Sequence, residues 1–346
     1  MNYIQLQEYN NILSLINIES FKNKSILVTG ANGLIGSYLI DFLLYVNNAF
    51  NYKIKIYAMA RSKRKLEKRF KPDKNLVLIE QDLNEPINKT IQVDYIVHAA
   101  SNAHPCAFSA DPVGTMKTNL LGTINLLEMI KGTNTKFLYI SSGEIYGNNI
   151  DNAPFREEDF GSIDTKNPRS CYPESKRAAE TICVSYNAQF GLSVNILRLC
   201  YVYGPVITAD NSRADAQFLR NAINGEDIIL KSEGLQRRTY LYVADAISAI
   251  LLVLSNGKNA EFYNVANPDS IASVREYASI LAKTSNVGLK FETPDDIEKR
   301  GYSKPLDSIL NSDKLINLGW RPFYGLKEGL SNTIKIKKEI LFCLKK

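Results

Sequence analysis

The sequence predicts an α/β protein of Rossmann type, in which helices cover both faces of a doubly wound parallel sheet. Short apolar segments rich in β-branched residues alternate with segments of helical periodicity along the first 200 residues, which is typical of βαβ units. The segment 25–29 (SILVT) leads directly into a glycine-rich turn at 30–36 (GANGLIG) and a helical segment that reaches residue 44. A strand, a glycine-rich turn and a helix in this order predict the start of a dinucleotide-binding unit.

The glycine-rich turn and the strand after it bear on the cofactor. Glycines allow the backbone to turn sharply and to approach a pyrophosphate, to which the N-terminus of the next helix offers N–H groups. The second predicted strand, 53–60, is followed by Arg61 and not by an acidic residue. An acidic residue there would bind the ribose 2′-hydroxyl of NAD, whereas a guanidinium suits the 2′-phosphate of NADP. The residue at this position therefore does not decide between NAD and NADP as the cofactor.

Composition excludes several classes of protein. The 346 residues carry a net charge of +6, with 45% hydrophobic and 23% charged residues, as in an ordinary globular protein. The five cysteines show no CxxC pair and there are two histidines, so we expect neither a disulfide framework nor a metal site. No apolar run reaches membrane-spanning length, and residues 1–5 show no basic segment before an apolar one, so we expect neither a membrane span nor a signal peptide. We therefore expect a cytoplasmic protein that binds neither nucleic acid nor membranes.

The other elements follow in order along the chain. An amphipathic helix is predicted within residues 1–20, and the helix after the fifth strand extends to about residue 190. Further strands are predicted by short apolar runs at 76–80, 95–101, 136–140 and 194–200.

Tyr172 and Lys176 form the most informative pair for catalysis. They are four residues apart and so lie on one face of a helix. An ammonium group near a phenol stabilises the phenolate, so we expect Lys176 to lower the pKa of Tyr172. A phenol with a lowered pKa can exchange a proton with a substrate hydroxyl near neutral pH.

The glycine spacing GxxGxxG, preceded by Thr29 and followed about 140 residues later by Tyr172 and Lys176, resembles the short-chain dehydrogenase/reductase superfamily. The resemblance is to its extended branch, the NAD-dependent epimerase/dehydratase family that acts on nucleotide sugars, and it covers residues 24–330. It implies a smaller C-terminal α/β substrate-binding lobe. It also implies a set of cofactor-binding residues, namely Gly30, Asn32, Gly33, Leu34, Ile35, Gly36, Arg61, Asp82, Leu83, Ala99, Ala100, Ser101, Tyr172 and Lys176.

Three further catalytic residues follow from the same resemblance. The segment 141–147 (SSGEIYG) is similar to the catalytic Ser/Thr segment of the family, which places Ser142 against the sugar 4-oxygen. Glu144 matches the acidic residue of 4,6-dehydratases and glucuronate decarboxylases, and Asn119 matches an asparagine that positions the lysine through water. The residues that the resemblance places against the substrate are Ser142, Gly143, Glu144, Tyr201, Arg213 and Arg238.

The resemblance implies an enzyme that oxidises the C4 hydroxyl of a nucleotide-diphosphate sugar with bound NAD or NADP and acts through a 4-keto intermediate. The segment 169–177 (RSCYPESKR) is similar to UDP-glucuronate decarboxylases, and Glu144 also fits a 4,6-dehydratase. The arginine that decarboxylases carry before the LGWRP signature has no clear match, with Arg300 or Lys304 as substitutes. A 4-epimerase and an NADPH-dependent 4-keto-sugar reductase remain alternatives.

The family pattern also predicts how the chain is divided. We expect a helical extension at 1–24, a cofactor domain formed by 25–200 with about 236–266, and a substrate lobe formed by 201–235 with 267–346. Helices near 116–130 and 172–190 form a dimer contact in relatives, so we expect a homodimer.

Overall fold

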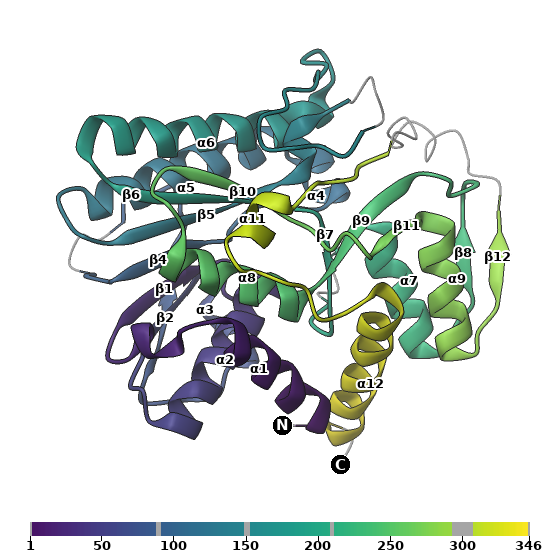
Figure 1. Ribbon diagram of the computed structural model, residues 1–346. Coiled ribbons are helices and arrows are strands. Elements are labelled where there is room, and N and C mark those ends of the chain that lie inside the picture. Colours follow the sequence, from purple (N-terminus) through teal and green to yellow (C-terminus); the bar gives the residue numbers. More distant parts are fainter. Residues whose placement is uncertain (1, 88–90, 149–152, 208–210, 293–306, 345–346) are drawn as a thin grey trace.

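The computed structural model describes residues 2–87, 91–148, 153–207, 211–292 and 307–344, and Figure 1 draws the others as a thin grey trace. Arg300 and Lys304 lie outside the described residues. Within the described part of the chain, no helix is both long and apolar enough to cross a membrane.

The centre of the molecule is a seven-stranded sheet in the order β10-β6-β5-β4-β1-β2-β3, and all of its strand pairs are parallel. The chain therefore winds outward from β1 in both directions, which confirms the predicted doubly wound fold and creates a crevice where the winding direction changes. The strands are β1 (Ser25–Thr29), β2 (Lys55–Ala60), β3 (Leu76–Glu80), β4 (Tyr95–His98), β5 (Lys136–Ser142), β6 (Ser193–Leu199) and β10 (Glu261–Val265).

Helices cover both faces of this sheet, with one group above it and another below it in Figure 1. Along β1, Ile26 and Val28 belong to one hydrophobic core and Leu27 to the other. Burial on both faces explains why the first strand reads as a continuous apolar run. The covering helices are α2 (Leu34–Phe50), α3 (Lys63–Arg69), α5 (Pro112–Ile130), α6 (Cys171–Phe190) and α8 (Val243–Asn256).

A second lobe stands beside the carboxyl ends of the central strands (Figure 1). It contains a three-stranded sheet in the order β11-β9-β7 and a two-stranded sheet of β8 and β12. Residues 237–242, which we expected in the cofactor domain, form a strand of this second sheet. The strands are β7 (Tyr201–Tyr203), β8 (Ile228–Leu230), β9 (Arg237–Tyr242), β11 (Ile271–Ser273) and β12 (Leu289–Phe291), and the helices are α7 (Ala214–Asn224), α9 (Val274–Ser285) and α12 (Leu326–Leu344). The short helix α11 (Asp313–Asn317) packs instead on β10 of the central sheet.

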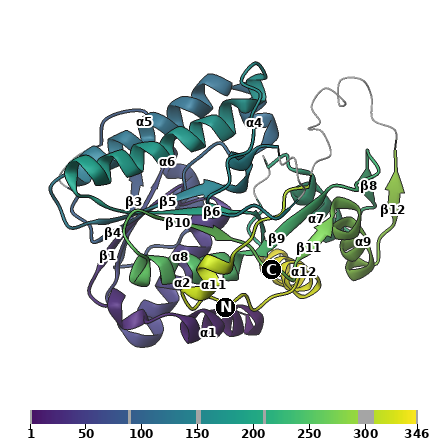
Figure 2. The same cartoon turned by 45° about the horizontal axis from the view of Figure 1, so that its top comes forward.

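The N-terminal helix α1 (Tyr3–Leu15) packs beside α8 and α12, and Figure 2 shows the two chain ends close together. Its Glu8 is fully buried and accepts hydrogen bonds from the hydroxyls of Tyr38 at 2.5 Å and Tyr242 at 2.6 Å. Burial raises the pKa of the Glu8 carboxyl. Since Tyr38 lies on α2 and Tyr242 on β9, this one carboxylate joins α1 to both lobes.

Candidate active site

The cofactor end of the site is formed by the turn between β1 and α2. Gly30 has a positive φ of 65°, and a Cβ added to Gly36 would lie 2.5 Å from the carbonyl oxygen of Gly30. Only glycine fits both positions, because the turn is left-handed at one and the helix packs directly on the turn at the other. The cradle therefore has the shape that a pyrophosphate requires at a helix N-terminus.

A cavity of about 170 Å³ continues from this turn past the ends of β2, β3 and β4. The guanidinium of Arg61 at its edge is exposed and lies 3.4 Å from Asn102 Oδ1. Most of the predicted cofactor residues therefore lie where an adenosine could bind. The lining residues are Gly30, Asn32, Gly33, Met59, Ala60, Arg61, Gln81, Asp82, Leu83, Ala99, Ala100, Ser101, Asn102 and Thr118.

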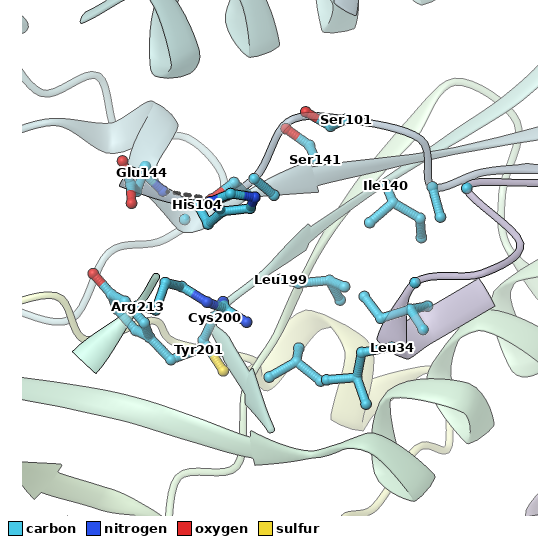
Figure 3. A pocket seen from close by; sticks show the side chains of 18 of the residues that line it. Leu34, Ser101, His104, Ile140, Ser141, Glu144, Leu199, Cys200, Tyr201 and Arg213 are labelled. Carbon is cyan, nitrogen blue, oxygen red and sulfur yellow. Dashed lines mark hydrogen bonds between the residues drawn. The ribbon is translucent and has the colours of Figure 1, made fainter. Parts of the chain in front are cut away.

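The main cavity, of about 250 Å³, adjoins the same glycine turn and extends towards the second lobe. Figure 3 shows its two ends, with the aliphatic side chains of Leu34, Ile140 and Leu199 near the glycine turn and the polar side chains of Glu144, Tyr201 and Arg213 at the other end. The predicted residues that line it are Gly30, Gly33, Leu34, Ile35, Gly36, Ala99, Ser101, Ser142, Gly143, Glu144, Tyr172, Lys176, Tyr201 and Arg213.

Tyr172 and Lys176 lie in the first turns of α6 and both line this cavity. The ammonium of Lys176 donates a hydrogen bond to the Ile140 carbonyl oxygen over 2.7 Å. Burial lowers the pKa of Lys176 to about 7.

We expected a lowered pKa for Tyr172, but in this structure that pKa is raised, and the charge of Lys176 is not among the causes of the shift. Burial raises the pKa of the Tyr172 phenol, and the charge of Glu144 raises it further. A hydrogen bond with Ser142 and the charge of Arg213 act in the opposite direction but are outweighed. The phenol is therefore protonated at neutral pH, because desolvation dominates over the nearby cations.

Asn119 is buried on α5 and does not line the main cavity. Its Nδ2 donates to Ser175 Oγ over 2.8 Å, and its Oδ1 accepts from Ser101 Oγ over 2.8 Å. Ser175 precedes Lys176 on α6. Asn119 therefore bonds directly to the residue next to the lysine, and its contact with Lys176 through water stays a prediction.

Ser142 and Glu144 lie where β5 ends and a short 3₁₀ turn, η2 (Gly143–Tyr146), begins. Ser142 Oγ accepts a hydrogen bond from the backbone N–H of Glu144 over 3.2 Å (Figure 3). The Glu144 carboxylate is partly exposed to the cavity and lies 3.7 Å from the guanidinium of Arg169. One turn of backbone therefore presents a hydroxyl and a carboxylate to the same space.

The second lobe contributes Tyr201, Arg213 and Arg238. The guanidinium of Arg238 lies over the Tyr201 ring, 4.4 Å from its centroid, and donates to Gln236 Oε1 over 2.7 Å. Arg213 lines the cavity, but Arg238 lies behind Tyr201 and is not part of the lining. The Nε atoms of both arginines are buried without a hydrogen-bond partner among the described residues, which suits an incoming anion.

The cavity also contains residues that we did not predict. His104 follows β4 and its Nδ1 lies 3.3 Å from Ser212 Oγ, which joins the first lobe to the segment that carries Arg213. Asn211, Cys200 and Ser308 are further lining residues. His104 could have been predicted from the sequence, because it follows a central strand and ligands bind at the carboxyl ends of such strands. Ser308 could not, because it comes from a distant part of the chain.

Comparison with known proteins places this geometry in a family. The model of the NAD dependent epimerase/dehydratase family matches residues 26–266. The chain belongs to this family. It is therefore an NAD-dependent enzyme, and the glycine cradle with its adjoining cavity fits that cofactor.

Two relatives are identical to the chain at a third of the aligned positions. A UDP-glucuronic acid decarboxylase 1 of Xenopus tropicalis is 33% identical over 92% of this chain and 73% of the relative. UDP-glucuronic acid decarboxylase 5 of Arabidopsis thaliana is 33% identical over 89% of this chain and 87% of the relative.

Solved structures agree with the fold. UDP-glucose 4-epimerase of Thermotoga maritima, solved with UDP-glucose, has a TM-score of 0.78 at 24% identity over 92% of this chain and 99% of its own. The dTDP-glucose 4,6-dehydratase of Bacillus anthracis, solved with NAD, has a TM-score of 0.74 at 23% identity over 91% of this chain and 97% of its own.

Proposed function

We propose that this chain modifies a nucleotide-diphosphate sugar by oxidising its C4 hydroxyl and acting on the 4-keto sugar, with decarboxylation of UDP-glucuronate as the overall reaction. The observation that carries the proposal is the placement of Glu144 in one cavity with Ser142 and Tyr172, close enough for its charge to raise the pKa of Tyr172. Transfer of a proton at C4 alone requires no such carboxylate. Its presence supports a second step at C5.

NAD, when bound, would supply both redox steps at C4, the oxidation at the start and the reduction that restores the hydroxyl at the end, so that the overall reaction is redox-neutral. The phenolate form of Tyr172, a minor species at neutral pH because the pKa of the phenol is raised, takes the proton of the C4 hydroxyl. Ser142 fixes that oxygen by a hydrogen bond. The C4 ketone then withdraws electrons from the C5–C6 bond, which breaks with release of carbon dioxide and leaves an enolate. A proton must then be added to C5. Glu144, once its partly exposed carboxyl has taken up a proton from solvent, delivers it to that carbon. Arg213 on the second lobe is placed to bind the diphosphate.

A 4,6-dehydratase is the second candidate. The same carboxylate could remove the C5 proton while a hydroxide leaves C6, and the Bacillus anthracis structure carries a dehydratase name. The 33% identity to decarboxylases over most of the chain favours the first candidate. A 4-epimerase or a 4-keto-sugar reductase would leave Glu144 without a role.

Mass spectrometry of products tests the proposal. The purified protein with its retained dinucleotide is incubated separately with UDP-glucuronate, UDP-glucose and dTDP-glucose. Loss of carbon dioxide from UDP-glucuronate supports the first candidate, and loss of water from a hexose supports the second. An isomer of unchanged mass from UDP-glucose indicates an epimerase, and no oxidation of any of these sugars refutes the proposal.

The proposal extends to a homodimer in the cytoplasm. The outer face of α5 carries the exposed apolar side chains of Val113, Met116 and Leu121, and burial of such a stripe stabilises an interface. The described cysteines are free thiols, which suits a reducing compartment. If α5 forms the contact, Met116→Asp combined with Leu121→Asp yields a monomer in light scattering coupled to size-exclusion chromatography.

A further inference from the structure

The short turn η2, which carries Glu144, ends in a tyrosine that is tied to the core. This residue, Tyr146, is fully buried. Its hydroxyl donates a hydrogen bond to Asn264 Oδ1 over 2.7 Å and accepts one from the Arg198 guanidinium over 2.9 Å. The ring also stacks on Phe155, with centroids 4.7 Å apart and an interplanar angle of 10°. The end of the turn is therefore held through both the ring and the hydroxyl of one side chain.

Arg198 joins this tyrosine to α6, the helix of the catalytic tyrosine. It lies on β6 and is 6% exposed. Its Nε and one terminal nitrogen donate to the two carboxylate oxygens of Glu180 on α6, over 3.1 and 2.9 Å. The other terminal nitrogen donates to the Tyr146 hydroxyl and, over 2.8 Å, to the carbonyl oxygen of Glu157. Because a guanidinium holds its donors in a fixed planar fork, this one side chain sets where η2 lies relative to α6.

Ser142 and Glu144 depend on this anchor to different extents. Ser142 is the last residue of β5 and is paired with Leu199 in the parallel ladder between β5 and β6. The central sheet therefore sets its backbone position. Glu144 lies beyond that last pair, in the four-residue turn that ends at Tyr146. A change at Tyr146 should therefore move the Glu144 carboxylate more than the Ser142 hydroxyl.

We propose that the hydroxyl of Tyr146, held by Arg198, is a positioning group that keeps the Glu144 carboxyl within reach of C5 for proton delivery. The inference rests on the proposed function, because it explains how the acid of that same step is placed. Tyr146 is not among the residues that line the main cavity, so it acts through the turn and not on the sugar. Displacement of a catalytic group by about 1 Å can reduce a rate about 10²-fold.

Tyr146→Phe tests the inference, since it removes the hydroxyl and keeps the ring. In the NAD-loaded enzyme with UDP-glucuronate, we expect kcat to decrease about 10- to 100-fold. Reduced nicotinamide should accumulate in stopped-flow absorbance, because the step at C5 is delayed. The rate of C4 oxidation and the calorimetric Kd for UDP should each change less than about threefold, because the residues on α6, β5 and the second lobe keep their places.

A double-mutant cycle with Glu144→Gln distinguishes positioning from a general loss of structure. If Tyr146 acts through Glu144, the double variant Tyr146→Phe with Glu144→Gln should be no slower than Glu144→Gln alone. Losses that multiply, or a loss in C4 oxidation as large as that in kcat, would overturn the inference while the proposed function stands. Unchanged turnover in Glu144→Gln alone would refute the proposed step at C5, and the inference with it.

Tyr324→Phe is the matched control for the loss of a buried phenol hydroxyl. Tyr324 is 4% exposed, and its hydroxyl accepts a hydrogen bond from Asn11 Nδ2 over 2.8 Å, away from the cavity. This variant should lower the midpoint of thermal unfolding and leave turnover unchanged. Tyr146→Phe should still fold, since Arg177 on α6 continues to hold the turn by a hydrogen bond of 2.6 Å to the Ile145 carbonyl oxygen. Equal losses of turnover in both variants would assign the effect to stability and overturn the inference.

Discussion

The Lys176 ammonium donates a hydrogen bond to the Ile140 carbonyl oxygen over 2.7 Å at the end of the fifth central strand. The same ammonium lies 4.7 Å from the centroid of the buried Tyr139 ring. Two contacts on one side of the cavity thus anchor the lysine, yet burial still lowers its pKa to about 7. The lysine is therefore close to the point where it gains or loses a proton under physiological conditions.

This lowered pKa predicts a pH-dependent stability. The unfolded lysine titrates near pH 10.5 and the folded one near 7, so between these values the unfolded chain binds the additional proton. The contribution of Lys176 to the free energy of unfolding must then increase with pH over this window, by up to about 1.4 kcal/mol per pH unit. Urea denaturation of the cofactor-free protein from pH 7 to 9 should show a smaller increase for Lys176→Met than for the wild type. The exposed Lys22→Met is the control, and equal slopes for wild type and Lys176→Met would contradict the assignment.

Replacement of Tyr172 by Phe should reduce turnover by about 10²- to 10⁴-fold, because the C4 hydroxyl loses its proton acceptor. Binding of NAD and of UDP-glucuronate should persist, since the ring still stacks on Phe108. Product mass spectrometry and calorimetry measure the two effects. Tyr186→Phe, on the same helix but bonded to Glu128, should retain full activity. Unchanged turnover in Tyr172→Phe would rule out the phenol as the base.

Glu144→Gln should separate the two halves of the reaction. Proton transfer at C5 should slow by about 10²- to 10⁴-fold, so that the reduced nicotinamide accumulates in stopped-flow absorbance. Since Glu144 raises the pKa of Tyr172, its neutralisation should also move the ascending limb of the C4 oxidation rate, which reports deprotonation of the phenol, to lower pH. Glu174→Gln on α6, which pairs with Arg177 at 3.6 Å, should do neither. A shift of that limb to higher pH would refute the electrostatic argument.

Gly36→Ala should weaken the cofactor site. The new methyl would lie 2.5 Å from Gly30 O and 3.0 Å from Ala31 Cα, so the helix and the turn must move apart at a cost of about 1–3 kcal/mol. Thermal unfolding should shift downwards, and the Kd for NAD in calorimetry should increase about tenfold. Gly325→Ala is the control, because no heavy atom lies within 4 Å of its added Cβ. An unchanged Kd for NAD would show that the pyrophosphate does not use this turn.

Replacement of Arg61 by Ala tests whether the chain can also bind NADP. The exposed guanidinium beside the smaller cavity should contribute to binding of NADPH through its 2′-phosphate and contribute nothing to NADH. We expect calorimetry to show about a tenfold loss for NADPH alone. Arg64→Ala, which lies further along α3, is the control. Equal effects on both dinucleotides would remove any role of Arg61 in discriminating between them.

Local patterns in the sequence were enough to predict the strands and helices of the cofactor domain. β1 and β3 lie at 25–29 and 76–80, as predicted, and α6 ends at residue 190. These predictions succeed because apolar periodicity and glycine spacing are local properties of the chain. The glycine turn and the pair of Tyr172 and Lys176 were likewise identified from the sequence, because each of these patterns involves residues only a few positions apart.

The pKa shifts in the site and the contacts between distant segments could not be predicted from the sequence, because they depend on how the chain packs. The sign of the pKa shift of Tyr172 is the difference between desolvation and the charges of Glu144 and Arg213, which are contributed by separate segments. The place of 237–242 in the second sheet and the contact of Arg169 with Glu144 also depend on packing. Burial and charge act through space, so they are fixed only once distant segments have met.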